Sequence, residues 1–201
     1  MKLKIFSLVI VILMLTGCSA CTDVGTSNSM LQIVSLTGND LEGTEGSTTV
    51  FSDVLTAGGI INDNGVAELT ALPIDPMLPD TEITPYMDVM VDQIDVRFER
   101  PDGKNVEGVD VPVHFSQPVS MLASIGTTID VPFVLIRHVA KMEAPLLALR
   151  DVPSREFVLQ LIAIVTIHGK DMGGHRVAPV TGYISVWCGN FADPEEEEPA
   201  A

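Results

Sequence analysis

The chain has 201 residues, of which 27 are acidic, 11 are basic and 46% are hydrophobic, and its formal net charge is −16. This surplus of negative charge disfavours binding to nucleic acids, because their phosphate backbones are also negative. The apolar content is sufficient for a packed core and excludes a disordered composition, and the length fits one domain with tails.

The first residues have the order of a secretion signal. Lys2 and Lys4 precede an apolar stretch at residues 5–15 that only Ser7 interrupts. A membrane-spanning helix needs about 20 apolar residues, so this stretch is too short to be one. We therefore predict a signal peptide at residues 1–17, and the chain without it has 9 basic and 27 acidic side chains, a net charge of −18.

The sequence Leu15-Thr16-Gly17-Cys18 comes directly after the apolar stretch. It resembles the lipobox of bacterial lipoproteins, in which the thiol receives a diacylglyceryl group and the chain is cut before the cysteine. The resemblance implies a lipid on Cys18, with acyl chains such as palmitate, that anchors the protein to a membrane of the bacterial cell envelope. In that family an aspartate directly after the cysteine retains some proteins at the inner membrane. Ser19 occupies this position here, so the resemblance implies the outer membrane, with the protein facing the periplasm or the cell surface. An ordinary signal peptide with an unrelated cysteine is the alternative.

Composition divides the remaining chain into three parts. Residues 18–29 are small and polar and predict a flexible tether. Residues 30–191 hold the apolar segments and predict a single domain. Residues 192–201 contain four consecutive glutamates and predict a solvated acidic tail.

Short segments rich in β-branched residues predict strands in the first half of the domain, at residues 31–36 and 48–55. Residues 58–62 and 66–72 flank Asp63-Asn64-Gly65. Asn-Gly between apolar runs is a strong hairpin signal, so we expect a tight turn there. Residues 73–85 contain four prolines, which exclude a central strand or a regular helix.

The second half continues the pattern. Residues 87–99 predict a long strand whose phase changes at Asp92-Gln93, as a β-bulge would cause. Residues 111–115 and 127–136 predict strands that Pro112 and Pro132 place at edges or strand beginnings. Residues 157–167 are apolar on both faces and predict a central strand, for which a helix is the alternative. With a last strand at 177–187, about nine strands predict an all-β, antiparallel sandwich.

A second resemblance concerns residues 169–177, Gly-Lys-Asp-Met-Gly-Gly-His-Arg-Val. They resemble the D-x-x-G-N hairpin that joins the last two strands of bacterial immunoglobulin-like domains. Asp171 and Gly174 match this pattern, and His175 replaces its asparagine. The resemblance implies an immunoglobulin-like β-sandwich, but a fold of this kind does not specify a function.

His168, Asp171 and His175 are close together in this segment. Imidazole and carboxylate groups suit zinc or copper, so the three residues are candidate metal ligands. The interpretation that we favour is a polar turn in which Asp171 binds its own backbone. His114 and His138 are isolated in strand-like sequence and are interpreted as strand residues.

Cys21 and Cys188 are a possible disulfide, because the compartment outside the inner membrane is oxidising. The alternative is a buried Cys188 and an incidental Cys21.

Acidic residues are frequent between positions 75 and 95. A calcium site takes several carboxylates converging from loops, but no D-x-D-x-D-G loop is present, so a solvated acidic face is favoured. The residues concerned are Asp75, Asp80, Glu82, Asp88, Asp92 and Asp95.

No nucleophile elbow, HExxH zinc motif, P-loop or dinucleotide-binding motif is present. With only one tryptophan and two tyrosines, a sugar-binding platform is disfavoured. We therefore expect a non-enzymatic protein without a cofactor, anchored by its lipid, that holds or docks a protein partner in the envelope. The alternative is a module that binds a ligand or a divalent metal ion.

Overall fold

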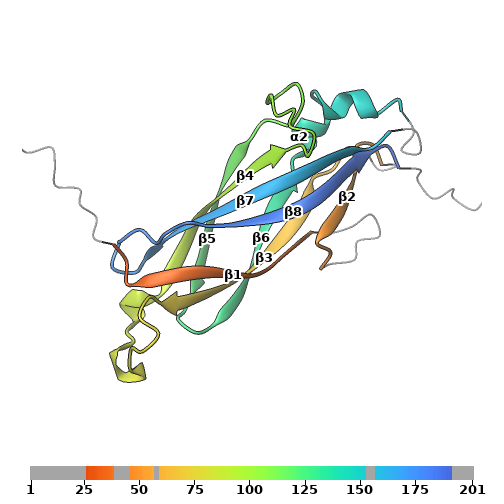
Figure 1. Cartoon of the computed structure of the whole chain (residues 1–201). Coiled ribbons are helices and arrows are strands. Elements are labelled where there is room, and N and C mark those ends of the chain that lie inside the picture. The colour runs from red at the N-terminus through yellow and green to blue at the C-terminus, as the bar shows by residue number, and fades with distance from the viewer. Residues whose placement is uncertain (1–25, 39–45, 57–58, 153–156, 192–201) are drawn as a thin grey trace, which may run out of the picture.

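The computed structural model describes residues 26–38, 46–56, 59–152 and 157–191, and strands predominate in them (Figure 1). The predicted signal peptide, Cys18, Cys21 and the predicted acidic tail lie outside the described residues. Within those ranges there are eight strands: β1 (Ser29–Gly38), β2 (Thr49–Asp53), β3 (Asp63–Pro73), β4 (Val89–Glu99), β5 (Phe115–Ala123), β6 (Thr128–Ile136), β7 (Leu159–Asp171) and β8 (Val180–Gly189).

The described strands form two sheets, which confirms the prediction of an all-β protein. The first sheet has the order β1-β3-β6, and the second has the order β2-β8-β7-β4-β5. Neighbouring strands are antiparallel except β2 and β8, which run parallel. The prediction of a purely antiparallel arrangement is therefore wrong at β2, because the chain crosses from the first sheet to the second after β1 and meets β8 in the same direction.

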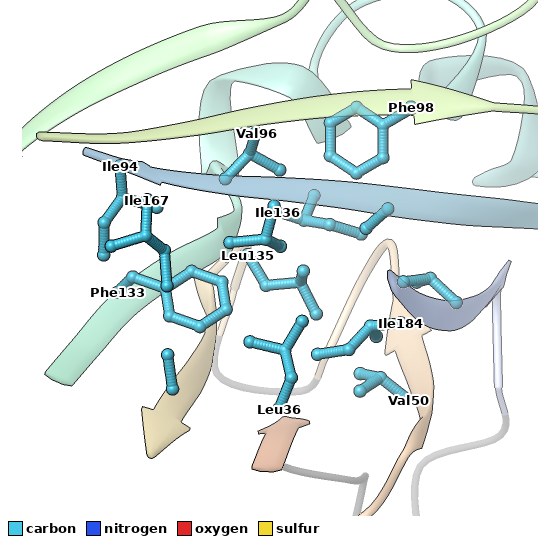
Figure 2. Packing of buried hydrophobic residues seen from close by; sticks show 14 of the residues in the cluster. Leu36, Val50, Ile94, Val96, Phe98, Phe133, Leu135, Ile136, Ile167 and Ile184 are labelled. Carbon is cyan, nitrogen blue, oxygen red and sulfur yellow. The ribbon is translucent and has the colours of Figure 1, made fainter. Parts of the chain in front are cut away.

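The core lies between the two sheets. Alternate side chains point inward, as the two-residue period of a strand requires. In Figure 2, Leu36 and Leu135 from the first sheet face the layer of Val96, Ile167 and Ile184 from the second. All five are buried. Each such side chain contributes roughly 1.5–3 kcal/mol relative to full exposure, so this layer is the main source of stability.

The predicted central strand is confirmed, and the helix alternative for it is wrong. β7 lies between β4 and β8 in the middle of the five-stranded sheet. The β-bulge predicted within residues 87–99 is also present, in β4. The register of β4 against both β5 and β7 shifts between Val91 and Gln93. This bulge keeps Val91 on the buried face together with Ile94, on both sides of the phase change.

The hairpin predicted at Asn64-Gly65 is wrong. Both residues lie inside β3, which pairs with β1 and β6, and residues 59–62 form no named strand. Gly65 is required here by close packing. A Cβ at this position would lie 2.6 Å from the Phe133 ring and 2.9 Å from the carbonyl oxygen of Thr37. Gly65 therefore lies where neighbouring strands and the Phe133 ring pack closely, and only a residue without a side chain fits there. A tight turn requires glycine for a different reason, its access to positive φ.

The strand predicted at residues 111–115 is also wrong, since only Phe115 belongs to a strand and β5 continues from it to Ala123. The count of about nine strands is corrected to eight for the described residues. Proline explains part of the error. Pro112 precedes the strand, whereas Pro118 lies within β5, where it is tolerated because β5 is the edge of its sheet. Pro132 lies in β6, the edge of the first sheet, as predicted.

Two irregular segments complete the described fold. The proline-rich segment contains only the single-turn helices η2 (Asp80–Glu82) and η3 (Pro85–Met87), as expected from its prolines. The connection from β6 to β7 contains α2 (His138–Lys141) and η4 (Leu146–Leu149). His138 is therefore the first residue of a short helix, and its interpretation as a strand residue is wrong.

Candidate functional site

The turn after β7 has the geometry of the favoured interpretation, a polar turn in which Asp171 binds its own backbone. The Oδ1 atom of Asp171 accepts a hydrogen bond of 2.9 Å from the backbone N–H of His175. The backbone N–H of Gly174, whose φ is +88°, donates to the carbonyl oxygen of Asp171. The aspartate thus closes its own turn, and the glycine adopts the left-handed conformation that the turn needs.

Hydrogen bonds at this turn also fix the charge of Asp171. Burial acts to raise the pKa of its carboxyl, but the backbone N–H of His175 and the side chains of Ser27 and His175 donate to it and lower the pKa below the ordinary value. Asp171 is therefore a stabilised carboxylate.

The structure does not bring His168 to this turn. His168 and Asp171 lie on opposite faces of β7, and His168 Nε2 lies 2.8 Å from Oδ2 of Asp95 on β4. Burial raises the pKa of Asp95, but hydrogen bonds from Ser116, Gln93 and His168 outweigh it and lower the pKa. Among the described residues, no three His, Cys, Asp or Glu side chains are grouped to hold a metal ion. His168 therefore does not complete a ligand set with Asp171 and His175.

Four of the six acidic residues between positions 75 and 95, namely Asp75, Asp88, Asp92 and Asp95, have separate partners. Asp88 accepts hydrogen bonds from Ser124 Oγ and the N–H of Ile125, which joins the start of β4 to the turn after β5. Asp92 forms an ion pair of 3.1 Å with Lys170. Asp75 accepts a hydrogen bond from the N–H of Met77. These carboxylates stabilise strand ends and turns and do not converge on one point. His114, which precedes β5, pairs with Glu107 at the surface.

Cys188 lies in the core with no exposed surface. Burial, followed by the negative charge of Asp63, raises the pKa of its thiol to about 12. The thiol is therefore protonated and unreactive at neutral pH. Because Cys21 lies outside the described residues, the pairing of the two cysteines stays a prediction.

A buried polar cluster, made of Ser52, Asp53, Asp63 and Lys141, was not foreseen from the sequence. Lys141 Nζ lies 2.8 Å from Oδ1 of Asp63 and donates to the carbonyl oxygen of Asp53, also at 2.8 Å. Ser52 Oγ donates to Oδ2 of Asp63 at 2.5 Å. Burial is the largest influence on Asp63 and raises its pKa, although Lys141 and Ser52 act against this.

The cluster is closed to external molecules. The side chain of Lys141 is 0% exposed and that of Asp63 is 14% exposed. Ser52 is buried as well. A serine, a carboxylate and a lysine in contact have the chemistry of a nucleophilic site, but a substrate needs access to the nucleophile. The cluster could not be predicted from the sequence, because Lys141 and Asp63 are 78 residues apart, the sequence pattern places Asp63 in a turn, and no motif contains Lys141.

Aromatic side chains form a patch on the outer face of the second sheet, which we call the aromatic patch. It consists of Phe51 on β2, Tyr183 and Trp187 on β8, and Phe191. The ring centroids of Phe51 and Trp187 lie 6.2 Å apart, and those of Phe51 and Phe191 lie 5.8 Å apart. Tyr183 is 67% exposed, and Phe51 and Trp187 are each more than one third exposed. The patch is therefore accessible to a partner.

A cleft of about 570 Å³ lies near the start of β1, between the proline-rich segment and the turn after β7. Its lining includes Tyr86, Asp171 and His175. Two of the three candidate metal ligands thus face the cleft, and His168 does not line it.

No protein-family model, curated protein or solved structure matches the chain. In the part of the chain that the structure describes, no helix has the length and apolar character needed to cross a membrane. Function must therefore be argued from the surfaces and clusters described above.

Proposed function

We propose that the protein is a lipid-anchored, non-enzymatic module of the bacterial cell envelope that binds a protein partner through its aromatic patch. The observation that carries this proposal is the patch itself. Phe51 contacts Trp187 and Phe191 on one surface, and Tyr183 lies on the same face of β8, so the patch holds four of the ten aromatic residues of the whole chain. Exposed aromatic clusters are typical of protein interfaces, because they bury a large area with few rotatable bonds.

The position of the patch suits an anchored protein. The described part of the chain begins at residue 26, at one end of the molecule, and β1 leads from this end toward the part of the molecule where β2 lies (Figure 1). Ten extended residues span about 33 Å. Cys18 precedes residue 26 by eight residues, a reach of at most about 28 Å. A lipid on Cys18 would thus hold the entry end near the membrane and present the patch away from it.

Three of the four edge strands of the described sheets, β2, β5 and β6, are poorer candidates for docking than the patch. On the edge strand β6, the side chain of Gln117 donates a hydrogen bond to the carbonyl oxygen of Val134 and accepts one from its N–H, both of 2.9 Å. Pro118 interrupts the edge strand β5, and the edge strand β2 has only five residues. Such features prevent the addition of a strand from another chain. We therefore place the partner on the outer face.

The strand order supports an immunoglobulin-like sandwich as the scaffold. If β1 and β2 are counted as one strand divided between the sheets, β3 and β6 take the second and fifth positions. β4, β7 and β8 then take the third, sixth and seventh. In immunoglobulin-like domains the second and fifth strands share one sheet, and the other three share the opposite sheet. β5 lies beside β4, as the extra strand of variable-type domains does.

The test is capture of partners from gently cross-linked membranes with the tagged full-length protein, identified by mass spectrometry. We expect a defined protein that is retained by wild type and lost with Trp187→Ser. Met77→Ser is the matched control, because Met77 is 85% exposed on the segment beside the entry end and should retain the partner. Cys18→Ser tests the anchor separately, since it should release the protein from membranes.

Three outcomes would overturn parts of the proposal. Capture that is equal for wild type and Trp187→Ser would remove the patch as the interface. Capture that is lost instead with His175→Ala would favour the alternative function, ligand binding in the cleft that Asp171 and His175 line. Wild-type protein that fractionates as Cys18→Ser does would refute the lipid anchor.

A further inference from the structure

Lys141 is the most unusual residue of the described core. Lysine is almost never fully buried unless its ammonium group is paired. Lys141 is completely buried near the end of α2, and its side chain reaches the first residue of β3. Removing both charges of such a pair from water carries a large desolvation penalty, so the charged pair is unfavourable at this position.

The geometry orients the amine toward the carboxyl group. Asp63 Oδ1 lies 2.8 Å from Lys141 Nζ, while the carbonyl oxygen of Asp53 accepts another proton of the same nitrogen. The second carboxyl oxygen of Asp63 accepts the hydroxyl proton of Ser52. Every polar atom of the two reacting groups is thus held by the surrounding strands and helix.

We propose that Lys141 and Asp63 condense to form an intramolecular amide bond, with the release of one water molecule. One proton passes from Nζ to Oδ1, which gives a neutral amine and a neutral acid. Nζ then attacks Cγ, the Cγ–Oδ1 bond breaks, and Oδ1 leaves as water with a second proton from Nζ. The third proton stays on the amide nitrogen, where the carbonyl oxygen of Asp53 accepts it. No oxidant, reductant or other reactant is needed.

The surroundings favour each part of this step. Low polarity favours the neutral acid and amine over the ion pair, and burial raises the pKa of Asp63 in the same direction. Ser52 donates a hydrogen bond to the oxygen on which negative charge develops when Nζ attacks. Two groups held in contact react with effective concentrations of up to about 10⁵–10⁸ M. The burial of the cluster, which keeps an external substrate out, does not hinder this reaction, since both reacting groups belong to the chain.

The test is peptide mapping of the purified wild-type protein by mass spectrometry after digestion with trypsin and a glutamate-specific protease. The second enzyme cuts after Glu45, Glu68 and Glu143, and trypsin cuts after Arg137. We expect a branched peptide that joins residues 46–68 to residues 138–143. Its mass should be lower by one water than the sum of the two peptides, and trypsin should not cut after Lys141, whose amine is blocked.

Recovery of residues 46–68 as a linear peptide, together with complete tryptic cleavage after Lys141, would overturn the proposal. This result is decisive in the wild-type protein alone. Lys141→Met is the negative control, because its side chain has no amine to condense and no branched peptide should form. Ser52→Ala should lower the branched fraction; an unchanged fraction would refute the role assigned to Ser52. The test is independent of the proposed docking function.

Discussion

Asp63 and Asp171 are two buried carboxylates whose pKa values shift in opposite directions. Asp171 receives its backbone hydrogen bond from a residue four positions away, in a turn near the surface. Asp63 is held by Ser52 and Lys141, which are 11 and 78 residues away. In the turn, hydrogen bonds outweigh burial and lower the pKa of Asp171, whereas in the core burial outweighs the partners and raises that of Asp63.

This difference shows that the same residue type serves two purposes. At the turn, the charge on Asp171 stabilises the fold, because several donors bind it. In the core, the carboxyl group of Asp63 depends on Lys141, which supplies its cation before the proposed condensation and its amide partner after it. Loss of the partner should therefore be far more harmful at Asp63 than at Asp171.

The largest expected effect is that of Lys141→Met. Removal of the lysine leaves the Asp63 carboxyl with neither the cation nor the amide link that Lys141 would supply. The unpaired carboxylate alone costs roughly 3–5 kcal/mol of unfolding free energy. Denaturant unfolding followed by circular dichroism measures this. The double variant with Asp63→Leu should recover much of the loss, since no unpaired charge remains. A Lys141→Met protein as stable as wild type would contradict the description of the pair.

A smaller effect is expected for Asp171→Asn, about 1–2 kcal/mol at neutral pH, because the charge-assisted hydrogen bonds of the turn are weakened. The pKa of Asp171 lies below its ordinary value of 3.8 in the folded protein. Its contribution to stability is therefore present above pH 3.8 and is lost as the pH falls through the lowered folded pKa. Urea unfolding should show that the difference in unfolding free energy between wild type and Asp171→Asn becomes smaller as the pH is lowered through this range. A constant difference would contradict the assignment.

The smallest effect is expected for His168→Ala. The side chains of His168 and Asp95 are 27% and 36% exposed, so solvent screens their interaction. Partly exposed pairs of this kind contribute about 0–1 kcal/mol. Thermal unfolding should change little, and added salt should reduce the difference further. A loss as large as that of Asp171→Asn would show that His168 has a structural role beyond this pair.

The sequence predicted the features that depend on neighbouring residues. The two-residue period identified β7, and its change of phase identified the bulge in β4, because alternation and its interruption are local properties. Asp171 and Gly174 predicted the turn for the same reason. Asn64-Gly65 misled the prediction, since glycine serves close packing as well as tight turns.

The tertiary structure alone decided the contacts between distant parts of the chain. The parallel pairing of β2 with β8 depends on where the chain crosses between sheets, and no local pattern encodes it. The contact of Lys141 with Asp63 arises because the connection after β6 folds back over the start of β3. A lysine in a short apolar segment has no periodicity to show whether it is exposed or buried. The sequence by itself therefore determined most of the strands and the turn at Asp171. The folded chain determined which charged groups meet, because burial and long-range contact depend on how the sheets pack.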